Sequence, residues 1–186
     1  MMPAVEKAGS PESEVEMNIF VMRHGQAAPE ASTDALRSLT EQGRDEVSLM
    51  AHWLAPQVTL FDLVLVSPYV RAQQTWLQLS KDIPSLHVET CEQLTPSCDA
   101  DLAASLILAY GDRYPNGNIL VVSHMPLVGY LVESLCSGIM APIFVTSGIA
   151  KVTVNKGAGG MLAWLEGPHN IQAHYRPTFQ ALRSLG

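Results

Sequence analysis

The chain lacks the cysteine pattern of a disulfide-bonded or zinc-binding protein. It has three cysteines, Cys91, Cys98 and Cys136, and no two of them stand in a Cys-x-x-Cys spacing. An odd number leaves at least one thiol without a partner, and structural zinc sites usually need closely spaced ligand pairs. The sequence therefore predicts free thiols that behave as small apolar side chains, which suits a reducing cytoplasm.

Positive charge and long apolar runs are also scarce. The chain carries 11 Lys and Arg against 18 Asp and Glu, for a formal net charge of −7. Nonspecific nucleic-acid binding needs a basic surface, so this balance disfavours a nucleic-acid partner. No apolar run approaches the roughly 20 residues that cross a bilayer. Any site for an anion must therefore be a local cluster of positive side chains.

The first 16 residues lack the apolar segment of a signal peptide and contain four Glu. We interpret residues 1–16 as a flexible N-terminal extension. Residues 17–186 are interpreted as a single domain, because a chain of 186 residues fits one domain. With free thiols and no membrane segment, we expect the protein to be cytoplasmic. We also expect it to be a monomer.

What the sequence does contain is a regular alternation of strand and helix patterns. Strands are predicted at residues 18–22, 62–67, 87–90 and 118–122, and helices at residues 40–55, 69–80, 101–110 and 126–136. A hairpin of strands at 149–154 and 161–165 follows, and the last 19 residues are expected to form a helix or a surface wrap. The alternation predicts an α/β domain, with helices on both faces of a mostly parallel sheet and an antiparallel edge. Pro68 is expected in the first turn of its helix.

Reactive side chains stand directly after three of these strands. Arg23 and His24 follow the first strand, and His124 follows the strand at 118–122. Ser67 ends the second strand, and Arg71 comes one turn into the next helix. Because open α/β sheets bind ligands beyond the carboxyl ends of their strands, we expect these residues to converge on one spot.

These residue types favour a phosphoryl group as the ligand. The planar guanidinium of arginine matches phosphate oxygens, and it neutralises charge during transfer. A neutral imidazole is a competent nucleophile, and Gly25 would let the backbone approach the ligand closely. No metal or other cofactor is expected, since no metal-ligand spacing occurs among the six histidines. The four others, His52, His87, His169 and His174, are expected to have no part in the chemistry.

Three motifs, in this order, resemble the signature of the histidine phosphatase superfamily, also called phosphoglycerate mutase-like. They are the RHG of residues 23–25, the SP…RA…QT element of residues 67–75 and the VVSH of residues 121–124. Within that superfamily the chain is similar to the small phosphohistidine phosphatases of the bacterial SixA type, over roughly residues 17–170. The lack of a large inserted cap matches their compact form, and an open site would suit a phosphohistidine carried by a protein.

The resemblance implies a three-layer α/β/α fold and a function for each matching residue. His24 would be the nucleophile that becomes phosphorylated, and Arg23 and Arg71 would bind the phosphoryl oxygens. His124 would stabilise the group in transfer, and Arg37 would make an outer contact. Water would then hydrolyse phospho-His24 without a cofactor. The implied partner is a histidine-containing phosphotransfer domain or a phosphocarrier protein.

One departure from the superfamily concerns the proton donor. Gln93 stands where an acid is common, although Asp34 or Glu92 could supply a proton. A phosphohistidine substrate needs a donor less, because imidazole is a better leaving group than an alkoxide. A small-molecule phosphomonoesterase, a non-catalytic phosphoprotein-binding module and a metal-dependent hydrolase are the alternatives. We expect the imidazole of His24 to titrate near ~6.5, so that activity falls at acid pH.

Overall fold

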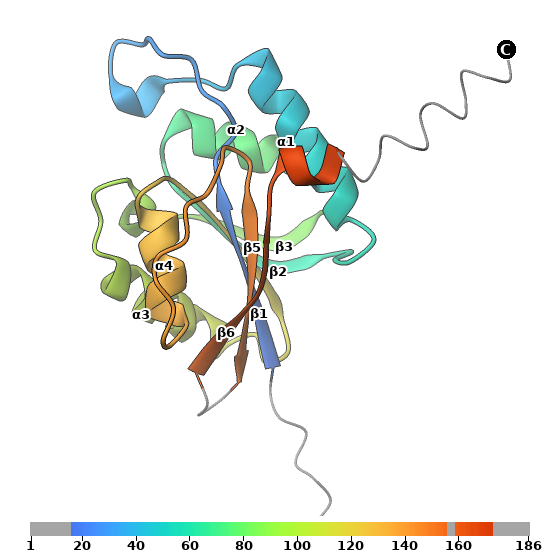
Figure 1. Ribbon diagram of the computed structural model, residues 1–186, viewed down its shortest axis with the longest axis vertical. Coiled ribbons are helices and arrows are strands. Elements are labelled where there is room, and N and C mark those ends of the chain that lie inside the picture. Colours follow the sequence, from blue (N-terminus) through green and yellow to red (C-terminus); the bar gives the residue numbers. More distant parts are fainter. Residues whose placement is uncertain (1–15, 156–158, 173–186) are drawn as a thin grey trace, which may run out of the picture.

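Strands and helices alternate along the part of the chain that the structure, a computed structural model, describes, residues 16–155 and 159–172 (Figure 1). The strands are β1 (Glu16–Arg23), β2 (Phe61–Val66), β3 (Ser85–Thr90), β4 (Asn118–Ser123), β5 (Ile149–Asn155) and β6 (Gly159–Glu166). The helices are α1 (Glu41–Leu54), α2 (Val70–Leu79), α3 (Ala100–Gly111) and α4 (Leu127–Leu135), with 3-10 turns η1 (Asp34–Leu36) and η2 (Glu92–Leu94). This order confirms the alternation that the sequence predicts.

The strands form one mixed sheet in the order β3-β2-β4-β1-β5-β6. The pairs β2–β3, β2–β4 and β1–β4 are parallel. β5 pairs antiparallel with both β1 and β6, so the final hairpin forms the antiparallel edge, as predicted. Because β4 lies between β2 and β1, the carboxyl ends of these three strands are neighbours.

Alternate side chains of the central strands face opposite layers of helices. Met17, Ile19 and Val21 of β1 pack on the face covered by α3 and α4. Phe20 and Met22 pack on the face covered by α1 and α2. Figure 1 shows these two pairs of helices on opposite sides of the sheet. Strands buried on both faces are typical of parallel sheets that lie between helix layers, and the result is the expected three-layer α/β/α fold.

Local capping sets where the helices begin. The hydroxyl of Thr40 accepts a hydrogen bond of 2.9 Å from Gly43 N and caps α1, as predicted. The carboxylate of Asp99 accepts one of 2.9 Å from Leu102 N and caps α3. Each side chain satisfies a backbone N–H that has no partner inside its helix.

The expected place of Pro68 in the first turn of α2 is wrong. Tyr69 has an extended backbone, with ψ of 136°, and is the N-cap, so the helix begins only at Val70. Pro68 therefore lies in the connection between β2 and α2. Its fixed φ helps to shape that connection, and it contributes nothing to the first helical turn.

Parts of the predicted organisation lie outside the described residues. The N-terminal extension is predicted at residues 1–16, and residues 1–15 lie outside the described part of the chain. Glu16 begins β1. Residues 156–158, in the predicted hairpin turn, also lie outside the described part. The C-terminal segment is helical over residues 168–172, and the remainder of that prediction falls outside. In the described part of the chain, no helix combines the length and the apolar character that crossing a membrane requires.

Two glycines bring α1 against the loop that follows β1. A Cβ on Gly43 would stand 2.1 Å from the carbonyl oxygen of Gln26, and a Cβ on Gly25 would stand 2.8 Å from that of Gly43. Thr40 adds two hydrogen bonds, from its N–H to Gln26 O at 2.9 Å and from its hydroxyl to the Gln26 side chain at 2.7 Å. This close packing holds the backbone next to His24 in place.

We expect Gly43→Ala to lower the free energy of unfolding by about 1–3 kcal/mol, because the added methyl overpacks the contact with Gln26. In an exposed helix interior the same change usually stabilises by up to about 1 kcal/mol, so the sign of the effect is the test. Arg44→Ala changes the exposed neighbouring position and should shift stability by at most about 0.5 kcal/mol. Urea denaturation measures both, and a stabilised Gly43→Ala protein would contradict the close packing.

Candidate active site

The carboxyl ends of β1, β4 and β2 bring the site residues that the sequence singles out into one region. His24 N donates a hydrogen bond of 3.0 Å to Ser123 O, and Ser67 N donates one of 3.0 Å to a carbonyl of β4. Arg23 is the last residue of β1, and Arg71 is the second residue of α2. The three strand ends are therefore joined directly, and their side chains share one site.

His24 is buried, and both of its ring nitrogens have partners. Nδ1 lies 2.7 Å from the carbonyl oxygen of Gly25, and Nε2 lies 3.1 Å from Nε of Arg71. A carbonyl oxygen only accepts hydrogen bonds and a guanidinium only donates them. The imidazole must therefore be neutral, with its proton on Nδ1 and its lone pair on Nε2.

The buried position of the two imidazoles lowers their pKa values. Burial lowers the pKa of His24 to about 4, and the positive charges of Arg71 and Arg23 add to this, although the Gly25 carbonyl raises it. Burial, and then the charge of a protonated His24, lowers the pKa of His124 to about 3. The expected ordinary pKa of His24 is therefore wrong, because the sequence shows neither the depth of the site nor the arrangement of its arginines.

The imidazole of His124 lies beside that of His24, with the ring centroids 5.0 Å apart. Tyr69 packs edge-on against the His124 ring at 5.0 Å. The His124 Nε2 shares a hydrogen bond of 2.7 Å with the hydroxyl of Ser67. Its Nδ1 is buried and has no partner among the described residues. Because such an unpaired polar atom is costly, a ligand atom bound there would be stabilised.

Arg23 has a similar unpaired group. Its Nη1 donates a hydrogen bond of 2.7 Å to the carbonyl oxygen of Phe144. Its Nε is buried and, in the described part of the chain, has no partner. A guanidinium nitrogen always carries its proton, so this Nε is a donor without an acceptor. An anion in the site would supply that acceptor.

Asp34 joins the two other arginines. Arg71 donates to the Asp34 carbonyl oxygen at 2.6 Å and to its carboxylate at 3.0 Å. Arg37 donates to the second carboxylate oxygen at 3.0 Å and to the carbonyl oxygen of Ala28 at 2.7 Å. Arg71 is 3% exposed, whereas the side chain of Arg37 is 31% exposed. Arg37 therefore lies at the rim, linked to Arg71 through Asp34.

The acids proposed as proton donors are poorly suited to that task. Burial alone would raise the pKa of Asp34, but the hydrogen bonds from Arg37 and Arg71, together with their charges, lower it overall. Asp34 is therefore ionised at neutral pH and has no proton to give. Glu92 is exposed on η2. Within residues 16–155 and 159–172, no three His, Cys, Asp or Glu side chains group closely enough to hold a metal ion.

Gly25 is in contact with both α1 and α2. Its N–H donates a hydrogen bond of 3.0 Å to Thr75 Oγ1, and Thr75 donates one of 2.7 Å to the carbonyl oxygen of Arg71. The space of its absent side chain is taken by Gly43 and Val47 of α1. This packing is one reason for glycine at the position. A contact between Gly25 and a substrate stays a prediction.

Residues 143–148, in the connection between α4 and β5, also support the site, and no feature of the sequence points to them. Ser147 N donates a hydrogen bond of 3.1 Å to His24 O, and Arg23 N donates one of 3.0 Å to Gly148 O. Thr146 donates one of 3.1 Å to the buried carboxylate of Glu46. No local motif signals this support, because it joins residues a hundred or more positions apart.

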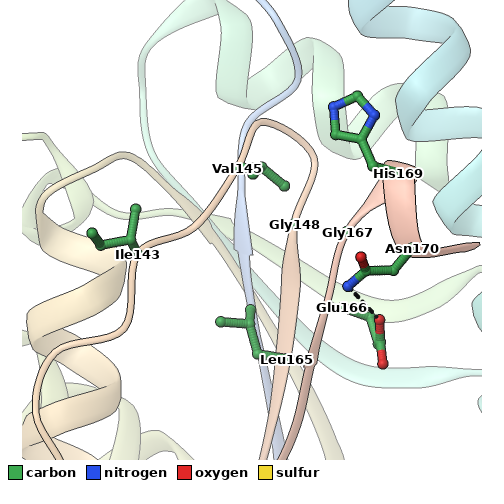
Figure 2. A pocket seen from close by; sticks show the side chains of 8 residues that line it. All are labelled: Ile143, Val145, Gly148, Leu165, Glu166, Gly167, His169 and Asn170. Carbon is green, nitrogen blue, oxygen red and sulfur yellow. Dashed lines mark hydrogen bonds between the residues drawn. The ribbon is translucent and has the colours of Figure 1, made fainter.

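A pocket of about 240 Å³ adjoins this connection (Figure 2). Figure 2 shows Ile143 and Val145 on one side of it and His169 above. None of the site residues predicted from the sequence lines this pocket. An open depression is instead lined by residues 29–34 and Arg37, so Arg37 is the predicted site residue that borders it.

Neutral imidazoles and guanidinium groups, gathered at the neighbouring ends of three parallel strands, are suited to an enzyme that acts on phosphoryl groups. The family model of the histidine phosphatase superfamily (branch 1) matches residues 19–96. The phosphohistidine phosphatase SixA of Escherichia coli K12 is 42% identical over 158 residues, which are 84% of this chain and 97% of that protein. The chain belongs to the histidine phosphatase superfamily, within its SixA-type group, and it is a hydrolase.

Two further relatives support this assignment. The SixA homolog of Haemophilus influenzae is 36% identical over 127 residues, which are 64% of this chain and 77% of that protein. A solved structure of the protein histidine phosphatase SixA complexed with tungstate is 41% identical and has a TM-score of 0.79. The match covers 83% of this chain and 99% of that one, and it confirms the phosphoglycerate mutase-like fold class.

The lowered pKa values predict how stability depends on pH. Between about pH 4 and the unperturbed value of 6.5, an unfolded histidine binds a proton that buried His24 and His124 do not bind. The free energy of unfolding should therefore fall as the pH drops through this window, by up to about 1.4 kcal/mol per pH unit for each histidine.

Urea denaturation at several pH values measures this dependence. His24→Asn and His124→Asn should each make the fall shallower, whereas His87→Asn, at an exposed position of β3, is the control and should change it little. An equally steep fall in all three variants and in the parent protein would show that the two buried imidazoles are not its source.

Proposed function

We propose that the chain is a phosphohistidine phosphatase, which removes the phosphoryl group from a phosphohistidine of another protein through a phospho-His24 intermediate. The observation that carries this proposal is the state of His24. Its Nε2 lone pair faces Arg71 at 3.1 Å while its proton is held on Nδ1 by the Gly25 carbonyl. The similarity to a phosphohistidine phosphatase of E. coli supports the choice of substrate.

In the first step, Nε2 of His24 attacks phosphorus in line with the P–N bond of the substrate. The new N–P bond forms as the old one breaks, and the substrate imidazole leaves with the electron pair and takes up a proton. The attacking nitrogen has no proton to lose, so this step needs no general base. The entering group would replace the hydrogen bond between Arg71 and His24 by one from Arg71 to a phosphoryl oxygen.

Arg23, Arg71 and His124 stabilise the charge on the group in transfer. Arg23 Nε and His124 Nδ1 lack partners among the described residues, and phosphoryl oxygens would pair with both. A related SixA has been solved with tungstate, a tetrahedral oxyanion like phosphate, which supports anion binding in this group of enzymes. Arg37, at the rim, places positive charge where the anion enters.

In the second step, water attacks the phosphorus of phospho-His24. The N–P bond breaks, the electron pair returns to Nε2, and the water proton leaves with inorganic phosphate or passes to solvent. This restores the neutral imidazole and its hydrogen bond from Arg71. The cycle uses only water and the side chains of the chain itself.

The weakness of the available proton donors favours a phosphohistidine over a sugar phosphate. An alkoxide leaving group needs a proton in the transition state, whereas imidazole leaves more easily and is protonated by water. Asp34 is held ionised by two arginines, and position 93 is an amide. We infer that a cytoplasmic phosphotransfer domain or phosphocarrier protein supplies the substrate. The open depression beside Arg37 leaves room for such a partner.

The intermediate gives the most direct test. Brief incubation with a ³²P-labelled phosphohistidine protein should label the chain with a phosphoryl group that is labile in acid and stable in base. His24→Ala should form no such adduct and should lose turnover, because it lacks the nucleophile. His52→Ala, an exposed histidine on α1, is the matched control and should label normally.

The same assay separates the substrate classes. We expect turnover of a phosphorylated phosphotransfer domain together with slow hydrolysis of sugar phosphates. Rapid hydrolysis of sugar phosphates, with no action on the phosphoprotein, would instead make the chain a small-molecule phosphomonoesterase. Labelling of His24→Ala at the level of the parent protein would rule out the intermediate.

Arg71→Ala should reduce kcat/KM by roughly 30- to 1,000-fold, equivalent to about 2–4 kcal/mol of transition-state stabilisation. The loss follows from removing charge-assisted hydrogen bonds to the phosphoryl oxygens. Arg44→Ala removes an exposed positive charge from α1 and should leave kcat/KM within about twofold. Full activity of Arg71→Ala, with a circular dichroism spectrum like that of the parent, would contradict the assigned contact.

A further inference from the structure

We propose that Ser67 is a positioning residue, which holds the imidazole of His124 in the tautomer protonated on Nδ1, so that this ring donates a hydrogen bond to the phosphoryl group. The inference rests on the proposed function, since it concerns the same reaction. It assigns a task to a serine that does not itself touch the reacting atoms.

The contacts of the Ser67 hydroxyl are few and well defined. Its oxygen lies 2.7 Å from His124 Nε2 and accepts a hydrogen bond of 3.4 Å from Tyr69 N. Ser67 is fully buried, and His124 is 1% exposed. In the described part of the chain, the hydroxyl makes no other hydrogen bond. Its single proton therefore has one available acceptor, His124 Nε2.

Counting protons decides between the two tautomers of the His124 ring. If Nε2 carried the proton, it would donate to Ser67, and both the hydroxyl proton of Ser67 and the Nδ1 lone pair would be buried without partners. If Nδ1 carries the proton, Ser67 donates to Nε2, and only the Nδ1 proton lacks a partner. The second arrangement leaves fewer unpaired groups, so it is the favoured one.

That tautomer is the one a phosphoryl group requires. The oxygens of the group only accept hydrogen bonds, so an N–H on Nδ1 stabilises them and a lone pair on Nδ1 repels them. His124 is next to the nucleophile, with its ring centroid 5.0 Å from that of His24. A neutral donor at this place stabilises charge that develops in the transition state.

The position of the ring is restricted from the same side. Tyr69, two residues after Ser67, packs edge-on against the His124 ring, and the guanidinium carbon of Arg71 lies 4.9 Å from the Tyr69 ring centroid. The connection between β2 and α2 therefore supplies both a hydrogen bond and a packing surface to His124. Ser67 keeps the proton of the His124 ring on Nδ1, and Tyr69 limits the rotation of that ring.

The tautomer can be observed directly in the full-length protein. In two-bond ¹H–¹⁵N correlation spectra, the protonated and unprotonated nitrogens of a neutral imidazole have well-separated ¹⁵N shifts. We expect the His124 signals of the parent protein to place the proton on Nδ1. In Ser67→Ala they should move to the other tautomer or to an average of the two. A proton on Nε2 in the parent protein would overturn the proposal.

Kinetics provide the second readout. Ser67→Ala should lower kcat by roughly 10- to 100-fold, the usual cost of losing a group that orients a functional side chain. In a His124→Ala background the same substitution should change kcat by less than about twofold, because there is no ring left to orient. Equal effects of Ser67→Ala in both backgrounds would assign the serine a purely structural task and overturn the proposal.

Ser123→Ala is the matched control. Ser123 is equally buried at a neighbouring strand end, but its hydroxyl donates to the carbonyl oxygen of Leu94 at 2.8 Å. We expect it to lower the melting temperature while leaving the His124 tautomer unchanged. The test also separates this proposal from the one above. Loss of the phosphoenzyme in His24→Ala concerns the reaction itself, whereas the tautomer and the double-mutant comparison concern Ser67 alone.

Discussion

A guanidinium donates to an imidazole only when that ring is neutral, so the hydrogen bond from Arg71 Nε to His24 Nε2 constrains the whole site. Burial provides the neutral state, because it lowers the pKa of His24 to about 4 despite the nearby carbonyl of Gly25. That carbonyl in turn keeps the proton on Nδ1. Thr75 links both partners by bonding to Gly25 N and Arg71 O, so α2 and the loop after β1 hold the pair together.

This arrangement costs stability, and the fold around it compensates. Arg23 Nε and His124 Nδ1 are buried without partners among the described residues, at a usual cost of about 1–3 kcal/mol for each such group. The central strands β1, β2 and β4 bury apolar side chains on both faces, and that burial supplies the compensating free energy. A site with unpaired polar groups is thus carried by a sheet with apolar packing on both faces. Such a loss of stability at a functional site is common in proteins.

The success of the sequence-based predictions varied with how local the relevant interactions are. The runs at 18–22, 62–67 and 118–122 became central strands, because a strand covered on both faces must be apolar throughout. Thr40 capped α1 as expected, since a cap needs only a hydroxyl three residues before a free N–H. Pro68, expected in the first turn of α2, lies in the connection before that helix. The pKa of His24 was wrong because it depends on burial and on charges from other elements.

The sequence by itself determined the alternation of strands and helices, and hence that Arg23, His24, Ser67 and His124 stand at the carboxyl ends of strands predicted to be parallel. These are consequences of hydrophobic periodicity and of the shared direction of parallel strands. Only the tertiary structure decided the protonation of the imidazoles, the pairing of Asp34 with two arginines and the support from residues 143–148. The physical reason is distance along the chain. Arg23 and Phe144 are 121 positions apart, and Ser67 and His124 are 57 apart, so no local pattern encodes their contacts.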